Sequence, residues 1–141
     1  MSRRELHHVG VAVPSIEAAL PFYRDTLGLE AGRVVELGEQ AVRVVFLEGG
    51  SGRIELLEPT DGASGVARFL AERGRATLHH VCFAVDDLAG ELREMAAAGI
   101  ELVDRAPRRG AEGDVAFLHP RAADGVLIEL IDRASLRGRR P

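Results

Sequence analysis

The strongest constraint in this sequence is an internal repeat. Residues 6–13 read LHHVGVAV and residues 78–85 read LHHVCFAV, so one eight-residue phrase occurs twice. Further along, VVFLEGGSGRIELLEP at 44–59 matches VAFLHPRAADGVLIELID at 115–132, with a slightly longer turn in the second copy. A repeat of this kind indicates two structural copies that bury a core together. The sequence therefore predicts two halves built on the same plan.

Each copy starts with the repeated phrase, which reads as a strand, and continues into helical periodicity. The helices are predicted in PSIEAALPFYRDTLGL (14–29) and in DDLAGELREMAAAGI (86–100). Gly28 and Gly99 stand where the end of a helix favours a left-handed residue. Pro21 lies inside the first helix, so that helix either begins at the proline or bends there. With the strands that follow, each copy reads as βαβββ.

These elements predict a single domain of class α+β. Its parts are a first βαβββ module at 1–63, a linker helix at 64–77 that ends at Gly74, a second βαβββ module at 78–133, and a flexible basic tail at 134–141. A chain of 141 residues is long enough for one ordinary domain, or for two small halves that share a core.

Composition excludes several classes of protein. A formal net charge of −4 gives no indication of a nucleic-acid partner, and no run approaches the roughly 20 apolar residues that cross a bilayer. No apolar segment follows the N-terminal arginines, so we expect no secretory signal. The single cysteine, Cys82, excludes an internal disulfide and fits a reducing compartment. We therefore expect a cytoplasmic protein.

Strand alternation distinguishes between the two histidines of each repeated pair. Side chains along a strand point alternately to opposite faces, so His8 and His80 share a face with small residues. Their neighbours His7 and His79 fall on the valine side and are expected to pack or hydrogen-bond. We expect the small-residue face to form the floor of a cavity, which favours His8 and His80 as site residues. His119 lies in a predicted turn, where a turn or substrate-contact role is expected.

Two glutamates occupy matching points of the repeat. Glu55 and Glu129 each stand between apolar residues of a strand, where a carboxylate is costly unless it is paired or bound to a cation. With His8 and His80 they offer four nitrogen and oxygen ligands, a set that suits a divalent first-row metal with room for water. The sequence thus predicts a metal site formed by His8, Glu55, His80 and Glu129.

The chain resembles the vicinal oxygen chelate superfamily, which includes glyoxalase I, extradiol dioxygenases and bleomycin-resistance proteins. The phrases that carry this likeness are HHVGVAV, FYRDTLGLE, VRVVFLEGG, IELLEP, LHHVCFAVDDL and GVLIELID. Within the superfamily, the run LHHVCFAVDDL, PRRGAEGDVAFLHP and GVLIEL is most similar to the methylmalonyl-CoA epimerase family. The likeness extends over nearly the whole chain.

The resemblance implies two βαβββ modules whose curved mixed sheet encloses a metal cavity, usually in a homodimer. It implies a divalent cation, most often Co2+, with Ni2+, Zn2+ or Mn2+ as alternatives, held at His8, Glu55, His80 and Glu129. At the position of Glu55 the family accepts Gln or Glu. It also implies a small acyl-CoA substrate and no nucleic-acid or membrane partner.

The activity implied is epimerisation at C2 of (2R)/(2S)-methylmalonyl-CoA through a metal-stabilised enolate. A base on one face removes the C2 proton and an acid on the opposite face returns one. Glu129 is expected to alternate between ligand and base. Some epimerases place the second glutamate at the position of Val44, where this chain has no carboxylate. Glu48 is the predicted second catalytic residue, and Glu39 and Glu55 remain alternatives.

Two other functions are compatible with the same pattern. A metal-dependent glyoxalase I (lactoylglutathione lyase) uses a His/Glu/His/Glu set on this fold, and only the contexts GDVAFLHP and GVLIEL favour the epimerase. A non-catalytic ligand-binding member of the superfamily is the second alternative. The presence of all four candidate ligands counts against it.

Overall fold

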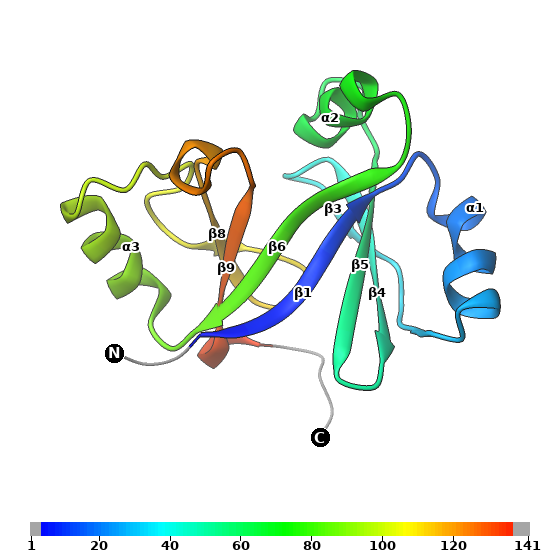
Figure 1. Ribbon diagram of the computed structural model, residues 1–141, viewed down its shortest axis with the longest axis horizontal. Coiled ribbons are helices and arrows are strands. Elements are labelled where there is room, and N and C mark those ends of the chain that lie inside the picture. The colour runs from blue at the N-terminus through cyan, green and yellow to red at the C-terminus, as the bar shows by residue number, and fades with distance from the viewer. Residues whose placement is uncertain (1–3, 137–141) are drawn as a thin grey trace. The chain divides into compact units, whose positions relative to one another are not determined.

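The computed structural model describes residues 4–136, which fall into two compact units (Figure 1). The first unit comprises residues 8–79, and the second contains residues 4–7 together with 80–136. The division lies inside two strands, directly before His8 and directly before His80. Both units combine a sheet with helices, which confirms the α+β class. The module borders predicted from the repeat stay a prediction, and most of the predicted basic tail lies outside the described residues.

The sheet of the first unit has the order β2-β4-β5-β1, and β3 also pairs with β4. The strands are β1 (Glu5–Ala12), β2 (Glu30–Ala31), β3 (Val35–Leu37), β4 (Val42–Gly49) and β5 (Gly52–Pro59). β4 and β5 form a long antiparallel hairpin (Figure 1), and β5 runs parallel to β1. The first strand predicted after the helix is thus split into β2 and β3, which both pair with β4.

The first helix changes pitch at Pro21. An α-helical segment, α1 (Ile16–Leu20), continues directly into a π-helical one, η1 (Pro21–Thr26). Proline has no N–H, and its ring would collide with a carbonyl of the preceding turn in a regular α-helix. The segment after Pro21 forms a π-helical turn, in which Leu27 N–H donates to Phe22 O at 2.8 Å. The helix therefore does not begin at Pro21.

One face of this sheet is closed by α1. Its buried core consists of Val11, Val13, Ile16, Val45, Leu47 and Leu56. Because side chains alternate along a strand, Phe46 and its ladder partner Glu55 lie on the opposite face. The linker helix α2 (Gly65–Arg73) follows β5 and ends, as predicted, at Gly74, whose φ is +75°.

The second unit follows the βαβββ order predicted for it. Its elements are β6 (Thr77–Val85), α3 (Leu88–Ala97), β7 (Arg108–Arg109), β8 (Asp114–Leu118), the 3-10 helix η2 (Pro120–Ala123), β9 (Ile128–Asp132) and the 3-10 turn η3 (Arg133–Ser135). The sheet order is β6-β9-β8-β7, with β6 parallel to β9 and β8 antiparallel to it. Gly99 after α3 has φ +85° and Gly28 has φ +77°, the left-handed conformations predicted from the sequence.

Helix α3 covers one face of the second sheet. The buried core there consists of Val85, Leu88, Leu92, Ala116, Leu118 and Leu130. Within residues 4–136, no helix is both long and apolar enough to cross a membrane.

Glu58 fastens the start of α1 to the sheet of the first unit. Its carboxylate accepts the N–H of Ile16 at 2.8 Å and a guanidinium N–H of Arg43 at 2.9 Å. Burial acts to raise the pKa of Glu58, but the hydrogen bonds from Ile16 and Arg43 outweigh it and leave the pKa below its ordinary value. A depressed pKa contributes stability above the unfolded-state value of about 4.3, and this is lost as the pH falls through the folded pKa.

Replacing Glu58 by glutamine should therefore lower the free energy of unfolding at pH 7 by about 1 kcal/mol, because Gln is a weaker acceptor and carries no charge. The difference between Glu58→Gln and the parent should begin to shrink once the pH falls below the unfolded-state pKa of about 4.3, because the unfolded chain takes up the proton first, and it should disappear below the lower folded-state pKa. Urea unfolding at pH 7, 5 and 3 measures this, with the exposed Glu72→Gln as control. A deficit that stays constant down to pH 3 would contradict the assignment.

Candidate functional site

In the first unit, His8 and Glu55 meet on the sheet face away from α1. His8 lies on β1, and Glu55 on the neighbouring β5 is the ladder partner of Gly10. The imidazole Nε2 is 3.2 Å from the carboxylate Oε1, and the two residues are only 3% and 7% exposed. Directly across the ladder from Glu55, the Phe46 ring meets the imidazole of His8 edge-on at 5.0 Å. The first unit thus holds a buried nitrogen–oxygen pair.

The second unit repeats this arrangement with different residues. His80 on β6 places its Nε2 3.1 Å from Oε1 of Glu129 on β9, and these residues are also 3% and 7% exposed. Glu129 pairs with Cys82 on one side and with Phe117 on the other. The ring of Phe117 lies edge-on to His80 at 5.7 Å. The sequence repeat is therefore also a repeat of contacts.

Each pair has the geometry of two adjacent ligands on one cation. Bonds of about 2.1 Å from a metal to nitrogen and oxygen, at a right angle, put the two ligand atoms about 3.0 Å apart. The observed separations of 3.2 and 3.1 Å agree with this. Imidazole and carboxylate are accepted by several first-row divalent ions. The described residues thus include buried His and Glu side chains able to bind a metal, two in each unit.

The remaining histidines have other contacts. His7 Nε2 lies 3.8 Å from a carboxylate oxygen of Glu112. The ring of His79 packs edge-on against Phe69 of α2, with the centroids 4.8 Å apart. His119 precedes η2 and caps its first turn through its side chain. The packing position predicted for His79 and the turn position predicted for His119 are confirmed, and the role of His7 stays a prediction.

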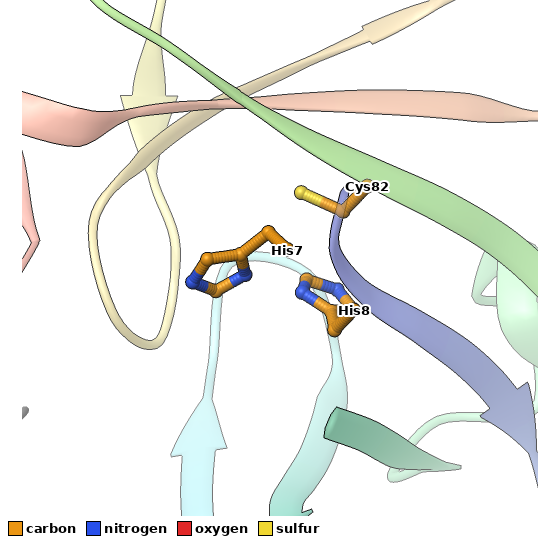
Figure 2. Close-up of side chains that lie close together, drawn as sticks. All are labelled: His7, His8 and Cys82. Atoms are coloured by element: carbon orange, nitrogen blue, oxygen red, sulfur yellow. The ribbon is translucent and has the colours of Figure 1, made fainter. Parts of the chain in front are cut away.

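The small-residue face of β6 does not form the open cavity floor that the sequence predicts. Cys82 and Ala84 are 0% and 4% exposed, because they are packed in a cluster with Val115 and Ile131. Figure 2 shows the Cys82 thiol beside the imidazole of His7, whose ligand nitrogen lies within 4.8 Å of the sulfur. The space above small side chains is usually filled by other groups, because protein interiors are closely packed and leave few voids.

This burial predicts that the Cys82 thiol is protected in the folded protein. Under native conditions we expect a thiol reagent such as Ellman's reagent to react at least about 100-fold more slowly than with a free thiol, because attack requires local opening. After unfolding in guanidinium chloride, one thiol per chain should react at once. Rapid stoichiometric labelling of the folded chain would show that β6 is open at this position.

Glu48, the predicted second catalytic residue, lies at the end of β4 on the same face as Phe46. Its side chain is 48% exposed, and its Oε2 lies 3.6 Å from Nε of Arg53, its cross-strand partner. Val44, on the same face, is buried and apolar. Glu39 is exposed in the turn between β3 and β4. The catalytic role of Glu48 stays a prediction.

Sequence reasoning missed the contacts that surround the two His–Glu pairs. Phe46 and Phe117 stand at matching points of the repeat, in VVFL and VAFL, and this was the available signal. The guanidinium of Arg53 lies over Phe46, with its Cζ 4.4 Å from the ring centroid. That of Arg108 lies 6.0 Å from the centroid of Phe117. Such contacts join residues whose spacing along the chain carries no pattern.

A cleft of about 570 Å³ lies beside α1 in the first unit. Its lining includes Leu20 of α1 and the ion-paired Arg43 and Glu58. Because Glu58 is an odd number of positions from Glu55 along β5, the two carboxylates project from opposite faces of the sheet. The cleft is therefore separate from the face that carries His8 and Glu55.

Comparison with known proteins gives consistent matches. The model of the Glyoxalase/Bleomycin resistance protein/Dioxygenase superfamily matches residues 7–117. An uncharacterized protein of Bacillus subtilis, YqjC, is 41% identical over 90% of this chain and 91% of its own length. The mitochondrial methylmalonyl-CoA epimerase of Mus musculus is 40% identical over 89% of this chain and 71% of that protein.

A solved structure shows the same fold. It is a Streptomyces coelicolor methylmalonyl-CoA epimerase variant in complex with 2-nitronate-propionyl-CoA. The TM-score is 0.87 at 33% identity, and the match covers 98% of this chain and 100% of that one. The resemblance and fold predicted from the sequence are confirmed.

Proposed function

The chain belongs to the Glyoxalase/Bleomycin resistance protein/Dioxygenase superfamily, and we propose that it is a metal-dependent epimerase acting at C2 of methylmalonyl-CoA. The observation that carries this proposal is the duplicated, buried His–Glu pair in a chain 40% identical to a methylmalonyl-CoA epimerase. The solved Streptomyces coelicolor relative, which binds an acyl-CoA analogue, supports an acyl-CoA as the ligand.

The two pairs are proposed to supply one cation with four ligands, His8, Glu55, His80 and Glu129. Two imidazoles and two carboxylates leave room for further oxygen ligands on Co2+, the expected ion, or on Ni2+, Zn2+ or Mn2+. When bound, such a cation would act as a Lewis acid that withdraws charge from the thioester carbonyl oxygen. The observed separation within each pair, close to that of neighbouring ligands, supports this assignment.

The proton at C2 is then moved by two carboxylates of the chain. Glu129 takes the proton from one face, and the electron pair of the broken C–H bond delocalises into the thioester. Glu48 returns a proton to the opposite face, which inverts the centre. Glu129 is buried while the side chain of Glu48 is about half exposed, so Glu48 can exchange its proton with water. The reverse reaction uses the same groups in exchanged roles.

The proposed partner in solution is a second copy of the chain. Family resemblance supports a homodimer, and the exposed Leu6 and Leu78, at equivalent places in the repeat, provide apolar surface that such a contact would cover. The exposed arginines Arg108, Arg109 and Arg121 are candidates for contacts with coenzyme A phosphates, through charge-assisted hydrogen bonds.

The activity is tested with (2S)-methylmalonyl-CoA and the Co2+-loaded protein in deuterated water. We expect interconversion of the epimers with deuterium entering C2 of the product, because the returning proton comes from a group in exchange with solvent. A parallel reaction with the glutathione–methylglyoxal hemithioacetal should show no turnover above background. Conversion of the hemithioacetal alone would replace the epimerase by a glyoxalase, and a lack of both reactions would leave a binding protein.

The ligand assignment is tested at the two places where histidines are adjacent, His7–His8 and His79–His80. In each place, the histidine that is not assigned as a ligand is the control. We expect His8→Ala and His80→Ala to lower the affinity for Co2+ by more than about 100-fold, beyond the effect of losing an outer hydrogen bond. The neighbouring His7→Ala and His79→Ala should bind Co2+ within about tenfold of the parent. Elemental analysis and competition with a chelator measure this. An equal loss of Co2+ affinity on replacing either of two adjacent histidines would refute the assignment.

A further inference from the structure

In each unit, one phenyl ring stands directly across the ladder from the glutamate of the His–Glu pair. Phe46 faces Glu55, and Phe117 faces Glu129. Each ring also meets the histidine of its pair edge-on, within the range of favourable aromatic contacts. The rings therefore restrict the rotation of the imidazoles and exclude water beside them.

Each ring is in turn covered by a guanidinium, but the two contacts differ in strength. The Cζ of Arg53 lies 4.4 Å from the centroid of Phe46, while that of Arg108 lies 6.0 Å from Phe117, at the limit of a cation–π contact. The side chain of Arg53 is 6% exposed and that of Arg108 is 43% exposed. A cation–π contact is stronger where water is excluded.

The strands that carry the two arginines add to the difference in strength between the two cation–π contacts. Arg53 lies in the eight-residue strand β5, where it pairs with Glu48 of β4, and the pairing of β5 with β1 begins at the next residue, Ile54. Arg108 belongs to β7, a strand of two residues at the end of its sheet. The Nε of Arg108 lies 3.6 Å from Oδ1 of Asp104, and Oδ2 of the same carboxylate accepts the Phe117 N–H. The arginine of the first unit is thus held more firmly.

We propose that Arg53, acting through Phe46, is a positioning residue that keeps the His8–Glu55 pair rigid, whereas the Arg108–Phe117 contact leaves the His80–Glu129 pair freer to move. This inference rests on the proposed metal site and deepens it. The His8–Glu55 pair would be the fixed part of the site that holds a bound cation, and the other pair contains Glu129, the carboxylate proposed as the base. The difference between the two arginine contacts thereby assigns the anchoring role to Glu55 and the role of base to Glu129.

The test measures metal release and needs no substrate. Co2+-loaded protein is mixed with excess chelator, and the visible absorption of bound Co2+ is followed with time. We expect Arg53→Gln and Phe46→Leu to release Co2+ about tenfold or more faster than the parent, the size typical for loss of a group that orients a ligand. The matched variants Arg108→Gln and Phe117→Leu should change the rate by less than about threefold.

Two further variants separate the ring contact from other effects. Phe46→Tyr keeps the ring and should release Co2+ at close to the parental rate. This variant keeps the test usable if Phe46→Leu or Arg53→Gln folds poorly. Glu48→Gln removes the ion-pair partner of Arg53 and should also leave the release rate unchanged. Faster release from Glu48→Gln, together with a parental rate for Phe46→Leu, would assign the effect to the ion pair and overturn the route through Phe46.

The outcomes distinguish this inference from the proposed function. If the parent binds no metal at all, the metal site fails and the inference falls with it. If the parent binds Co2+ but the Arg53 and Arg108 variants release it equally fast, only the inference is refuted. Faster release confined to the Arg53 and Phe46 variants supports it, whatever substrate the protein converts.

Discussion

Two carboxylates buried within β-sheets set the main physical constraint on this protein. Glu55 and Glu129 are almost without solvent contact, and each lies beside an imidazole nitrogen. A neutral imidazole offers a hydrogen bond but does not neutralise the charge, whereas a divalent cation does. Because each pair projects from the sheet face opposite the helix, the apolar core of each unit forms without disturbing it.

The features predictable from sequence are those set by local periodicity. Strand alternation selects His8 and His80 over their neighbours, since which face a side chain occupies depends only on its position along the strand. Helix ends are local as well, and Gly28 and Gly99 adopt the left-handed conformation expected of them. The repeat adds what a single copy lacks, because it places the glutamates at matching points of two strands.

The features that could not be predicted depend on partners distant in sequence. The small residues Cys82 and Ala84 of β6 are buried in a cluster with Val115 of β8 and Ile131 of β9, and nothing in the phrase LHHVCFAV indicates this. The contact of Arg53 with Phe46 is likewise a cross-strand contact, which the register of β4 and β5 determines.

We propose that the two His–Glu pairs bind one ion together. X-ray absorption spectroscopy of the Co2+-loaded protein, combined with metal analysis, tests it most directly. We expect one Co2+ per chain, coordinated by two imidazoles and by oxygen ligands at about 2.1 Å. Two ions per chain with one imidazole each, or a single ion with one imidazole, would contradict it.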